Sequence, residues 1–132
     1  MKNKNFIKSL SLSIIFVVII LSGCNAVVEE LTGPSALGNI LGIKGIYGGA
    51  GIQNDGASTA TIRVEVFTAD NIPTVGATVT LTTTLGILTA VTLTTGASGA
   101  AVTTLTSGLV TGMAFVTATV DNVSATTAVP II

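Results

Sequence analysis

Residues 112–120, Gly-Met-Ala-Phe-Val-Thr-Ala-Thr-Val, carry the clearest periodic pattern in the chain. Alanine and valine occupy every second position from residue 114 to residue 120, and Met113, Phe115 and two threonines fall between them. Successive side chains of a β-strand point to opposite faces of its sheet. The alternation therefore predicts a strand with one face toward a core and the other face outward.

The same period of two recurs on both sides of this segment. In five more stretches, residues at alternate positions are expected to share one face, namely 62–66, 77–83, 88–95, 101–105 and 123–129. The residues expected to point inward include Val79, Leu81, Val91 and Leu93. Glycine, proline, aspartate and asparagine separate the stretches, as turns require. Short strands at spacings of about 8 to 12 residues, with no helical pattern between them, predict an all-β antiparallel sandwich over residues 58–132.

A glycine-rich segment precedes the predicted sandwich. Residues 33–56 contain eight glycines in 24 positions, and glycine favours flexible, extended chain. We predict a mostly extended tether over residues 24–57. Leu37, Ile40 and Leu41 leave two alternatives open, a short helix or a strand added to the edge of the domain.

The first 23 residues have the composition of an export signal. Lys2, Lys4 and Lys8 precede an apolar run, and small residues follow it. The uncharged stretch from Ser9 to Gly23 is 15 residues long, which is short of the roughly 18 to 20 residues that a spanning helix needs. We therefore predict a cleaved signal peptide over residues 1–23.

The composition excludes several classes of function. After residue 23 only Lys44 and Arg63 are cationic, against six acidic side chains, which leaves a net side-chain charge of −4. Such a chain has no basic patch for phosphate, so nucleic acid is not an expected partner. It has no histidine, and its carboxylates are scattered singly, whereas acid–base catalysis uses His or a carboxylate beside a partner. We predict no catalytic residues, no enzyme activity and no bound cofactor.

Leu21-Ser22-Gly23-Cys24 resembles the lipobox of bacterial lipoproteins. The resemblance implies cleavage between Gly23 and Cys24, a diacylglyceryl group on the Cys24 thiol and an acyl group on the new amino terminus. Asn25 is not the aspartate that retains such proteins at the inner membrane of enteric bacteria, so the outer membrane is favoured in an organism that has one. The alternatives are a chance cysteine in an ordinary signal peptide and a buried structural thiol in the mature protein.

The turns and strands together resemble a bacterial Ig-like domain of group 1, the module found in tandem in intimin and invasin. The matching motifs lie at residues 62–70, 73–80, 83–88, 95–101, 105–107 and 112–118. The resemblance implies an Ig-like β-sandwich in a non-catalytic adhesion or spacing module with a protein or glycan ligand. Four glycines fall where the chain is expected to reverse with positive φ, namely Gly76, Gly86, Gly99 and Gly112.

The predicted outer faces are rich in threonine and poor in charge. One interpretation is β-propensity, since threonine suits a pleated, half-exposed surface. The other is self-association, because the surface lacks the usual charge repulsion. The alternative function is therefore a self-assembling subunit that pairs through its edge strands.

Two smaller groups of residues also invite a functional interpretation. Phe67, Met113 and Phe115 fall on outward positions and form a candidate contact patch, although the tether could cover the two phenylalanines. Three aspartates lie at predicted turns, Asp55, Asp70 and Asp121. We favour turn capping by these aspartates over calcium binding, which needs six to eight oxygen ligands, so no metal site is predicted.

Overall fold

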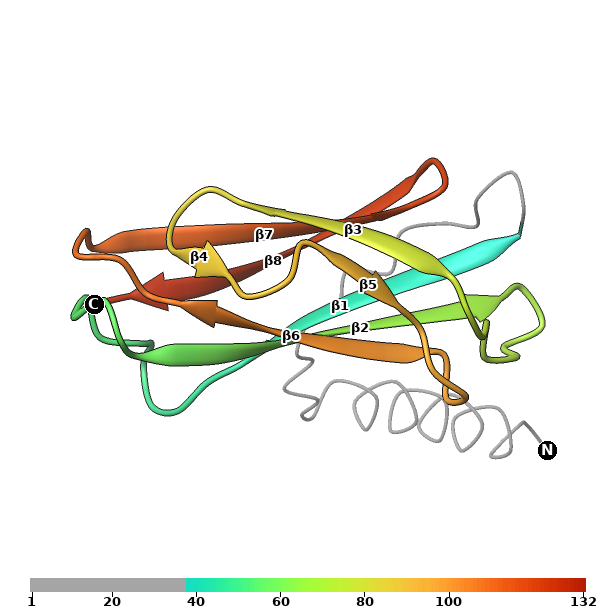
Figure 1. Cartoon of the computed structure of the whole chain (residues 1–132), viewed down its shortest axis with the longest axis horizontal. Coiled ribbons are helices and arrows are strands. Elements are labelled where there is room, and N and C mark those ends of the chain that lie inside the picture. The colour runs from blue at the N-terminus through green and yellow to red at the C-terminus, as the bar shows by residue number, and fades with distance from the viewer. Residues whose placement is uncertain (1–37) are drawn as a thin grey trace, which may run out of the picture.

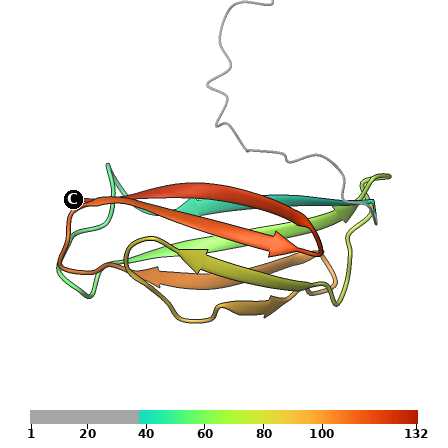
Figure 2. The same cartoon turned by 90° about the horizontal axis from the view of Figure 1, so that it is seen from above.

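The computed structural model describes residues 38–132. These residues form two four-stranded β-sheets that face each other (Figures 1 and 2). Every pair of neighbouring strands in either sheet is antiparallel. The predicted all-β antiparallel sandwich is therefore confirmed.

The two sheets each draw strands from both halves of the domain. Sheet A has the order β1-β2-β6-β4, and sheet B has the order β5-β3-β7-β8. The strand bounds are β1 Asn39–Ile46, β2 Thr59–Thr68, β3 Thr78–Thr83, β4 Ile87–Leu88, β5 Thr92–Thr94, β6 Ala100–Thr106, β7 Gly112–Val120 and β8 Val123–Ile131.

The core lies between the two sheets and follows the alternation in the sequence. On β7, the alanines and valine predicted to point inward, Ala114, Val116 and Ala118, are each 0% exposed. Burying a valine or leucine side chain contributes about 1.5–3 kcal/mol, and the described residues contribute such side chains from every long strand. The largest buried ones are Leu41, Ile62, Leu81, Leu105 and Ile131.

The four glycines expected at chain reversals, Gly76, Gly86, Gly99 and Gly112, all have positive φ. At Gly99, φ is 71°, and a Cβ atom would lie 2.5 Å from the carbonyl oxygen of Val66. The same neighbours are joined by a 2.8 Å hydrogen bond from the Val66 amide to the Gly99 carbonyl. A side chain at this position would therefore separate the start of β6 from β2.

The predicted tether is wrong for residues 39–46, which form strand β1. Leu41 and Ile43 in this strand are buried in the core, and all eight residues pair with β2. Of the alternatives left open by the sequence, a strand at the edge of the domain is the one that the structure shows. Residues 24–37 of the predicted tether lie outside the described residues.

The loop after β1 also belongs to the sandwich. Ile52 is 4% exposed and forms a parallel bridge with Ile131 in β8. Its amide donates a 2.9 Å hydrogen bond to the Pro130 carbonyl. The N-terminal boundary of the domain therefore lies before residue 58, because β1 and this loop complete the core on one side.

The strand predicted over residues 88–95 is divided between the two sheets. Thr89 donates to the Thr104 carbonyl in sheet A at 2.9 Å, whereas the Val91 carbonyl accepts from Leu81 in sheet B at 2.7 Å. The chain therefore crosses from β4 to β5 and closes this side of the sandwich (Figure 1). The prediction that Val91 points inward is wrong, because its side chain lies at the crossing and is 55% exposed.

The start of β1 and the C-terminus lie at opposite ends of the long axis (Figures 1 and 2). The loop between β6 and β7 lies at the C-terminal end, and the turn between β7 and β8 lies at the other end. In residues 38–132 we find no helix that could span a membrane.

Candidate functional site

The three residues of the predicted contact patch do not lie together. Met113 and Phe115 are on β7 and project from the outer face of sheet B, where they are 46% and 49% exposed. Phe67 is half-buried on β2, on the outer face of sheet A. The whole thickness of the sandwich separates the two groups, so any contact role is divided between two surfaces.

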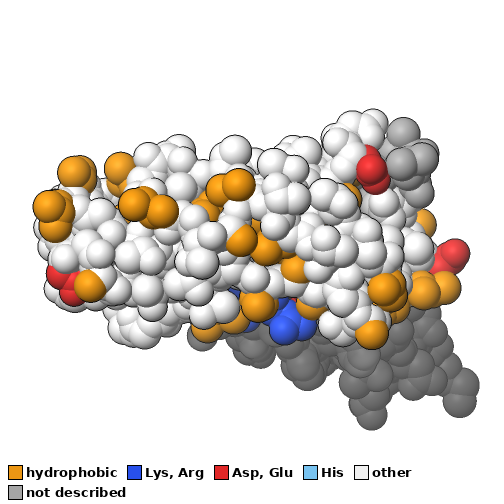
Figure 3. Space-filling view, in the orientation of Figure 1, with side chains coloured by type: hydrophobic (Ala, Val, Ile, Leu, Met, Phe, Trp, Pro, Cys, Tyr) orange, Lys and Arg blue, Asp and Glu red, His pale blue; other side chains and the backbone are white. Residues whose placement is uncertain are grey.

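Exposed apolar side chains lie at both ends of the molecule, and one group of them is at the C-terminal end (Figure 3). We call this set the apolar tip: Ile87, Leu109, Val110, Met113 and Ile132. Leu109 and Val110 lie in the loop between β6 and β7 and are 76% and 63% exposed. Exposed apolar groups that gather in one place are typical of interaction sites, and this loop was not singled out from the sequence.

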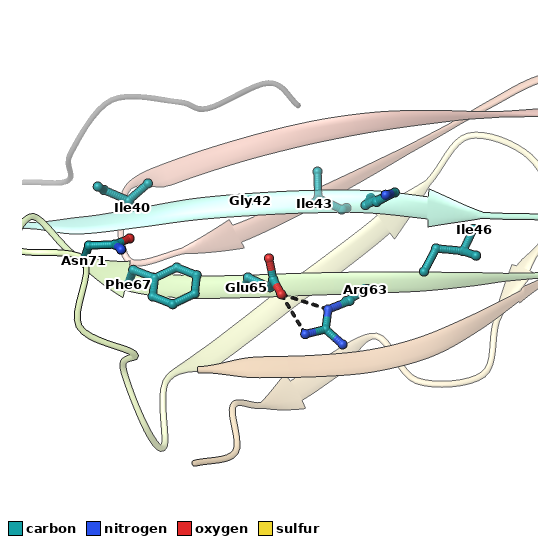
Figure 4. Close-up of a pocket in the computed structure, with 9 residues that line it drawn as sticks. Ile40, Gly42, Ile43, Ile46, Arg63, Glu65, Phe67 and Asn71 are labelled. Carbon is teal, nitrogen blue, oxygen red and sulfur yellow. Dashed lines mark hydrogen bonds and ion pairs between the residues drawn. The ribbon is translucent and has the colours of Figure 1, made fainter. Parts of the chain in front are cut away.

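A hollow of about 400 Å³ lies on the outer face of sheet A (Figure 4). We call it the β1–β2 hollow, and its lining residues are Ile40, Gly42, Ile43, Lys44, Ile46, Arg63, Glu65, Phe67 and Asn71. The strand register explains its shape, because Ile40 lies opposite Phe67, and Lys44 lies opposite Arg63. Between these pairs is Gly42, where a Cβ atom would meet only the Glu65 carbonyl oxygen, at 4.0 Å.

The charges in the β1–β2 hollow are only partly paired. Arg63 Nε and Nη2 donate to Glu65 Oε1 at 2.9 and 2.7 Å. The two side chains are 43% and 41% exposed, and such a pair contributes about 0–1 kcal/mol. Neither Lys44 Nζ nor Arg63 Nη1 has a hydrogen-bond partner within residues 38–132. The hollow therefore has a net charge of +1 and unused hydrogen-bond donors.

Residues 48–132 match the family model described as "Invasin, domain 3". The match covers more than half of the chain and seven of the eight strands, β2 to β8. The chain belongs to the invasin domain 3 family. This membership confirms the resemblance to intimin and invasin, and it extends the family match to the loop before residue 58.

Solved structures of related adhesins have the same fold as this invasin domain. The D0–D1 domain of intimin is 31% identical with a TM-score of 0.60 over 68% of this chain and 46% of that one. The Yersinia pseudotuberculosis adhesin InvE is 29% identical with a TM-score of 0.58 over 68% and 26%. A 282-residue C-terminal fragment of intimin, solved in complex with the intimin-binding domain of the translocated intimin receptor, is 33% identical with a TM-score of 0.55 over 67% and 30%.

The chain spans less than half the length of each of these three structures. No curated protein sequence matches it. The comparisons therefore show the family and the Ig-like fold of the domain.

Asp55 connects the loop before β2 to the loop after β6 through hydrogen bonds. Its carboxylate accepts the Ser58 and Ala57 amides at 2.6 and 2.9 Å, the Ser58 hydroxyl at 2.8 Å and the Ser107 hydroxyl at 3.2 Å. These bonds, led by the one from the Ser58 backbone, hold the pKa of Asp55 well below its ordinary value. The predicted turn capping is confirmed for this aspartate.

The other candidate residues from the sequence do not form a common site within residues 38–132. No three of the His, Cys, Asp and Glu side chains in the described range lie close enough to hold a metal ion. Asp121 accepts a 3.0 Å hydrogen bond from the Asn39 side chain at the opposite end of the molecule from Asp55. Gly23 and Cys24, the predicted cleavage and lipidation residues, lie outside the described residues.

Sequence reasoning missed the β1–β2 hollow, although a signal for it exists. Gly42 and Lys44 alternate with the buried Leu41 and Ile43, which is the period of a strand. Isoleucine occurs on both faces of this segment, so the sequence shows no clear alternation of apolar and polar residues here. The opposition of Lys44 and Arg63 depends on the pairing of two strands, which the sequence alone does not specify.

Proposed function

We propose that this invasin-type domain is a non-catalytic adhesion module that a lipid on Cys24 holds on the cell envelope. The match of residues 48–132 to invasin domain 3 carries the adhesive part of the proposal. Intimin and InvE, which share the fold, are described as receptor-binding and adhesin proteins respectively. The lipobox resemblance of residues 21–24 supports the anchor.

The shape of the domain suits display from an N-terminal anchor. The start of β1 and the apolar tip lie at opposite ends of the sandwich (Figure 1). A protein held by its N-terminal part therefore presents Leu109 and Val110 at the end away from the point of attachment. We propose that the apolar tip makes the contact with a protein or glycan ligand, in the way that exposed apolar groups commonly do.

Two measurements on cells that produce the full chain test this proposal. The first is the intact mass of the membrane-extracted protein, which we expect to equal residues 24–132 plus a diacylglyceryl group and an acyl chain. Each buried methylene of such chains contributes about 0.8 kcal/mol to membrane binding, so two or three chains anchor stably. The Cys24→Ala variant should lose the added mass and leave the membrane fraction, and lipid-free wild-type protein would contradict the anchor.

The second measurement is the attachment of these cells to a panel of immobilised host proteins and glycans. The double variant Leu109→Asp/Val110→Asp should reduce attachment to the best panel member by at least about tenfold, because it places charge in the apolar tip. Val75→Asp is the matched control, since Val75 is 65% exposed but lies between β2 and β3, at the other end. Equal attachment by all three proteins would contradict a contact role for the apolar tip.

A further inference from the structure

We propose that the β1–β2 hollow binds an extended acidic peptide segment of a partner protein. This inference rests on the adhesive role proposed above and adds a second surface with a defined ligand chemistry. The hollow lies on the outer face of sheet A (Figure 4), whereas the apolar tip lies at the C-terminal end.

The charge of the hollow selects an anion. Lys44 and Arg63 are the only cationic side chains in residues 38–132, and they lie directly opposite each other on neighbouring strands. Like charges in this position repel, and Glu65 neutralises only one of them. A ligand carboxylate between Lys44 Nζ and Arg63 Nη1 would use donors that have no partner in the described part of the chain.

The strand register sets the spacing of the ligand. Ile40 and Lys44 are four residues apart on β1, which corresponds to about 13 Å at about 3.3 Å per residue. In an extended peptide, residues i, i+2 and i+4 share a face and have the same rise. Such a peptide places one apolar side chain beside Ile40 and Phe67, a second above Gly42 and a carboxylate at Lys44 and Arg63.

A second copy of the chain does not offer this ligand from its described residues. Glu65 is the only acidic residue within a strand, and it already accepts two hydrogen bonds from Arg63. The other acidic residues of this part of the chain, Asp55, Asp70 and Asp121, lie in loops and turns. The acidic strand is therefore expected to come from another protein.

The test measures peptide binding by the full-length chain, purified in a non-ionic detergent. The probe is the fluorescent, C-terminally amidated peptide Val-Thr-Val-Thr-Glu, whose single carboxylate lies four residues from its first valine. Matched peptides end in Gln or Lys. We expect fluorescence anisotropy to show binding at least about tenfold tighter for the Glu peptide than for the Lys peptide. The difference should shrink as NaCl rises from about 0.05 to about 0.5 M, because salt screens exposed charges.

Variants of the chain identify the site. Gly42→Leu should weaken binding of the Glu peptide by at least about tenfold, because the new side chain enters the hollow, and its Cβ atom stays at van der Waals distance, 4.0 Å, from the Glu65 carbonyl oxygen. Lys44→Gln should weaken it about threefold, which corresponds to one exposed ion pair. Gly48→Leu is the control, since a Cβ atom at Gly48 also has open space but lies beyond β1. Circular dichroism of each variant establishes that it is folded.

Four outcomes would overturn the inference. Equal affinity for the Glu, Gln and Lys peptides, or unchanged binding by Gly42→Leu, shows that the hollow is not an acidic-peptide site. Stronger peptide binding by Glu29→Gln/Glu30→Gln assigns the hollow to the chain's own N-terminal segment. A dimer that Gly42→Leu dissociates assigns it to a second copy. Failure of the wild-type chain to attach cells to any panel member, with peptide binding intact, would instead count against the adhesive role alone.

Discussion

Asp55 shows how one charged side chain organises loops in a domain that has few charges. Its carboxylate accepts four hydrogen bonds, from residues in the loop before β2 and from Ser107 after β6. The second of these loops continues into Leu109 and Val110. Asp55 therefore supports the position of the apolar tip, although it does not belong to it.

We predict that Asp55 makes stability depend on pH in acid. Its pKa is lowered in the folded state, so its stabilisation is fully present above the unfolded-state pKa of about 3.9 and is lost as the pH falls through the lower folded-state pKa. The urea midpoint should therefore fall below about pH 4, and Asp55→Ala should remove part of this decline. Ser107→Ala, which removes only the 3.2 Å hydrogen bond to Asp55, should retain most of the decline in the urea midpoint. An unchanged pH profile for Asp55→Ala would refute the prediction.

Strand β1 is the element that differs most from the sequence-based prediction. It forms the edge of sheet A, and it contributes the fully buried Leu41 to the core and Gly42 and Lys44 to the hollow. At its C-terminal end, the Gly45 amide donates a 3.3 Å hydrogen bond to the Thr127 hydroxyl of β8. Because β1 connects the two sheets at this side, its loss should weaken the whole sandwich.

We predict that Leu41→Ala lowers the free energy of unfolding by about 2–5 kcal/mol, the usual cost of removing a buried leucine side chain. The measurement is urea unfolding of residues 25–132, which include every strand and the whole described core. Ile46→Ala on the same strand should cost less than about 1 kcal/mol, because Ile46 is 48% exposed. Equal, small effects would indicate that residues 39–46 are a tether after all.

At the scale of the whole molecule, the strands of sheet B, all within residues 38–132, carry no charged side chain on their outer face, and threonine dominates this face. Several of its hydroxyls bond to one another across β7 and β8. The hydroxyl oxygens of Thr117 and Thr126 are 2.8 Å apart, and those of Thr119 and Ser124 are also 2.8 Å apart. These groups are satisfied within one sheet, which favours the β-propensity interpretation of the threonines over self-association.

We therefore predict that residues 25–132 sediment as a monomer at concentrations up to about 1 mM. The β1 and β8 edges lie against each other, and proteins commonly cover sheet edges to prevent pairing with another chain. A dimer that dissociates in Thr82→Lys, on the outer face of sheet B, would support the self-assembling alternative. Thr61→Lys, on the outer face of sheet A, is the matched control.

Local patterns in the sequence were sufficient to predict the fold class and most of the strands. The alternation in residues 112–120 and the glycines at the reversals determine strands and turns through interactions between near neighbours in the chain. Family membership agrees with the motifs at residues 73–80 and 95–101. The inner face of β7 could be named residue by residue, because a period of two leaves one set of side chains for the core.

Only the tertiary structure decided where the strands lie relative to one another. It placed β1 in sheet A, divided residues 88–95 between the sheets, and put Phe67 and Phe115 on opposite faces. It also brought Lys44 opposite Arg63 to form the charged side of the hollow. The physical reason is that side-chain alternation depends on a strand's own residues, whereas neighbours and register depend on which distant strands bury their apolar faces together.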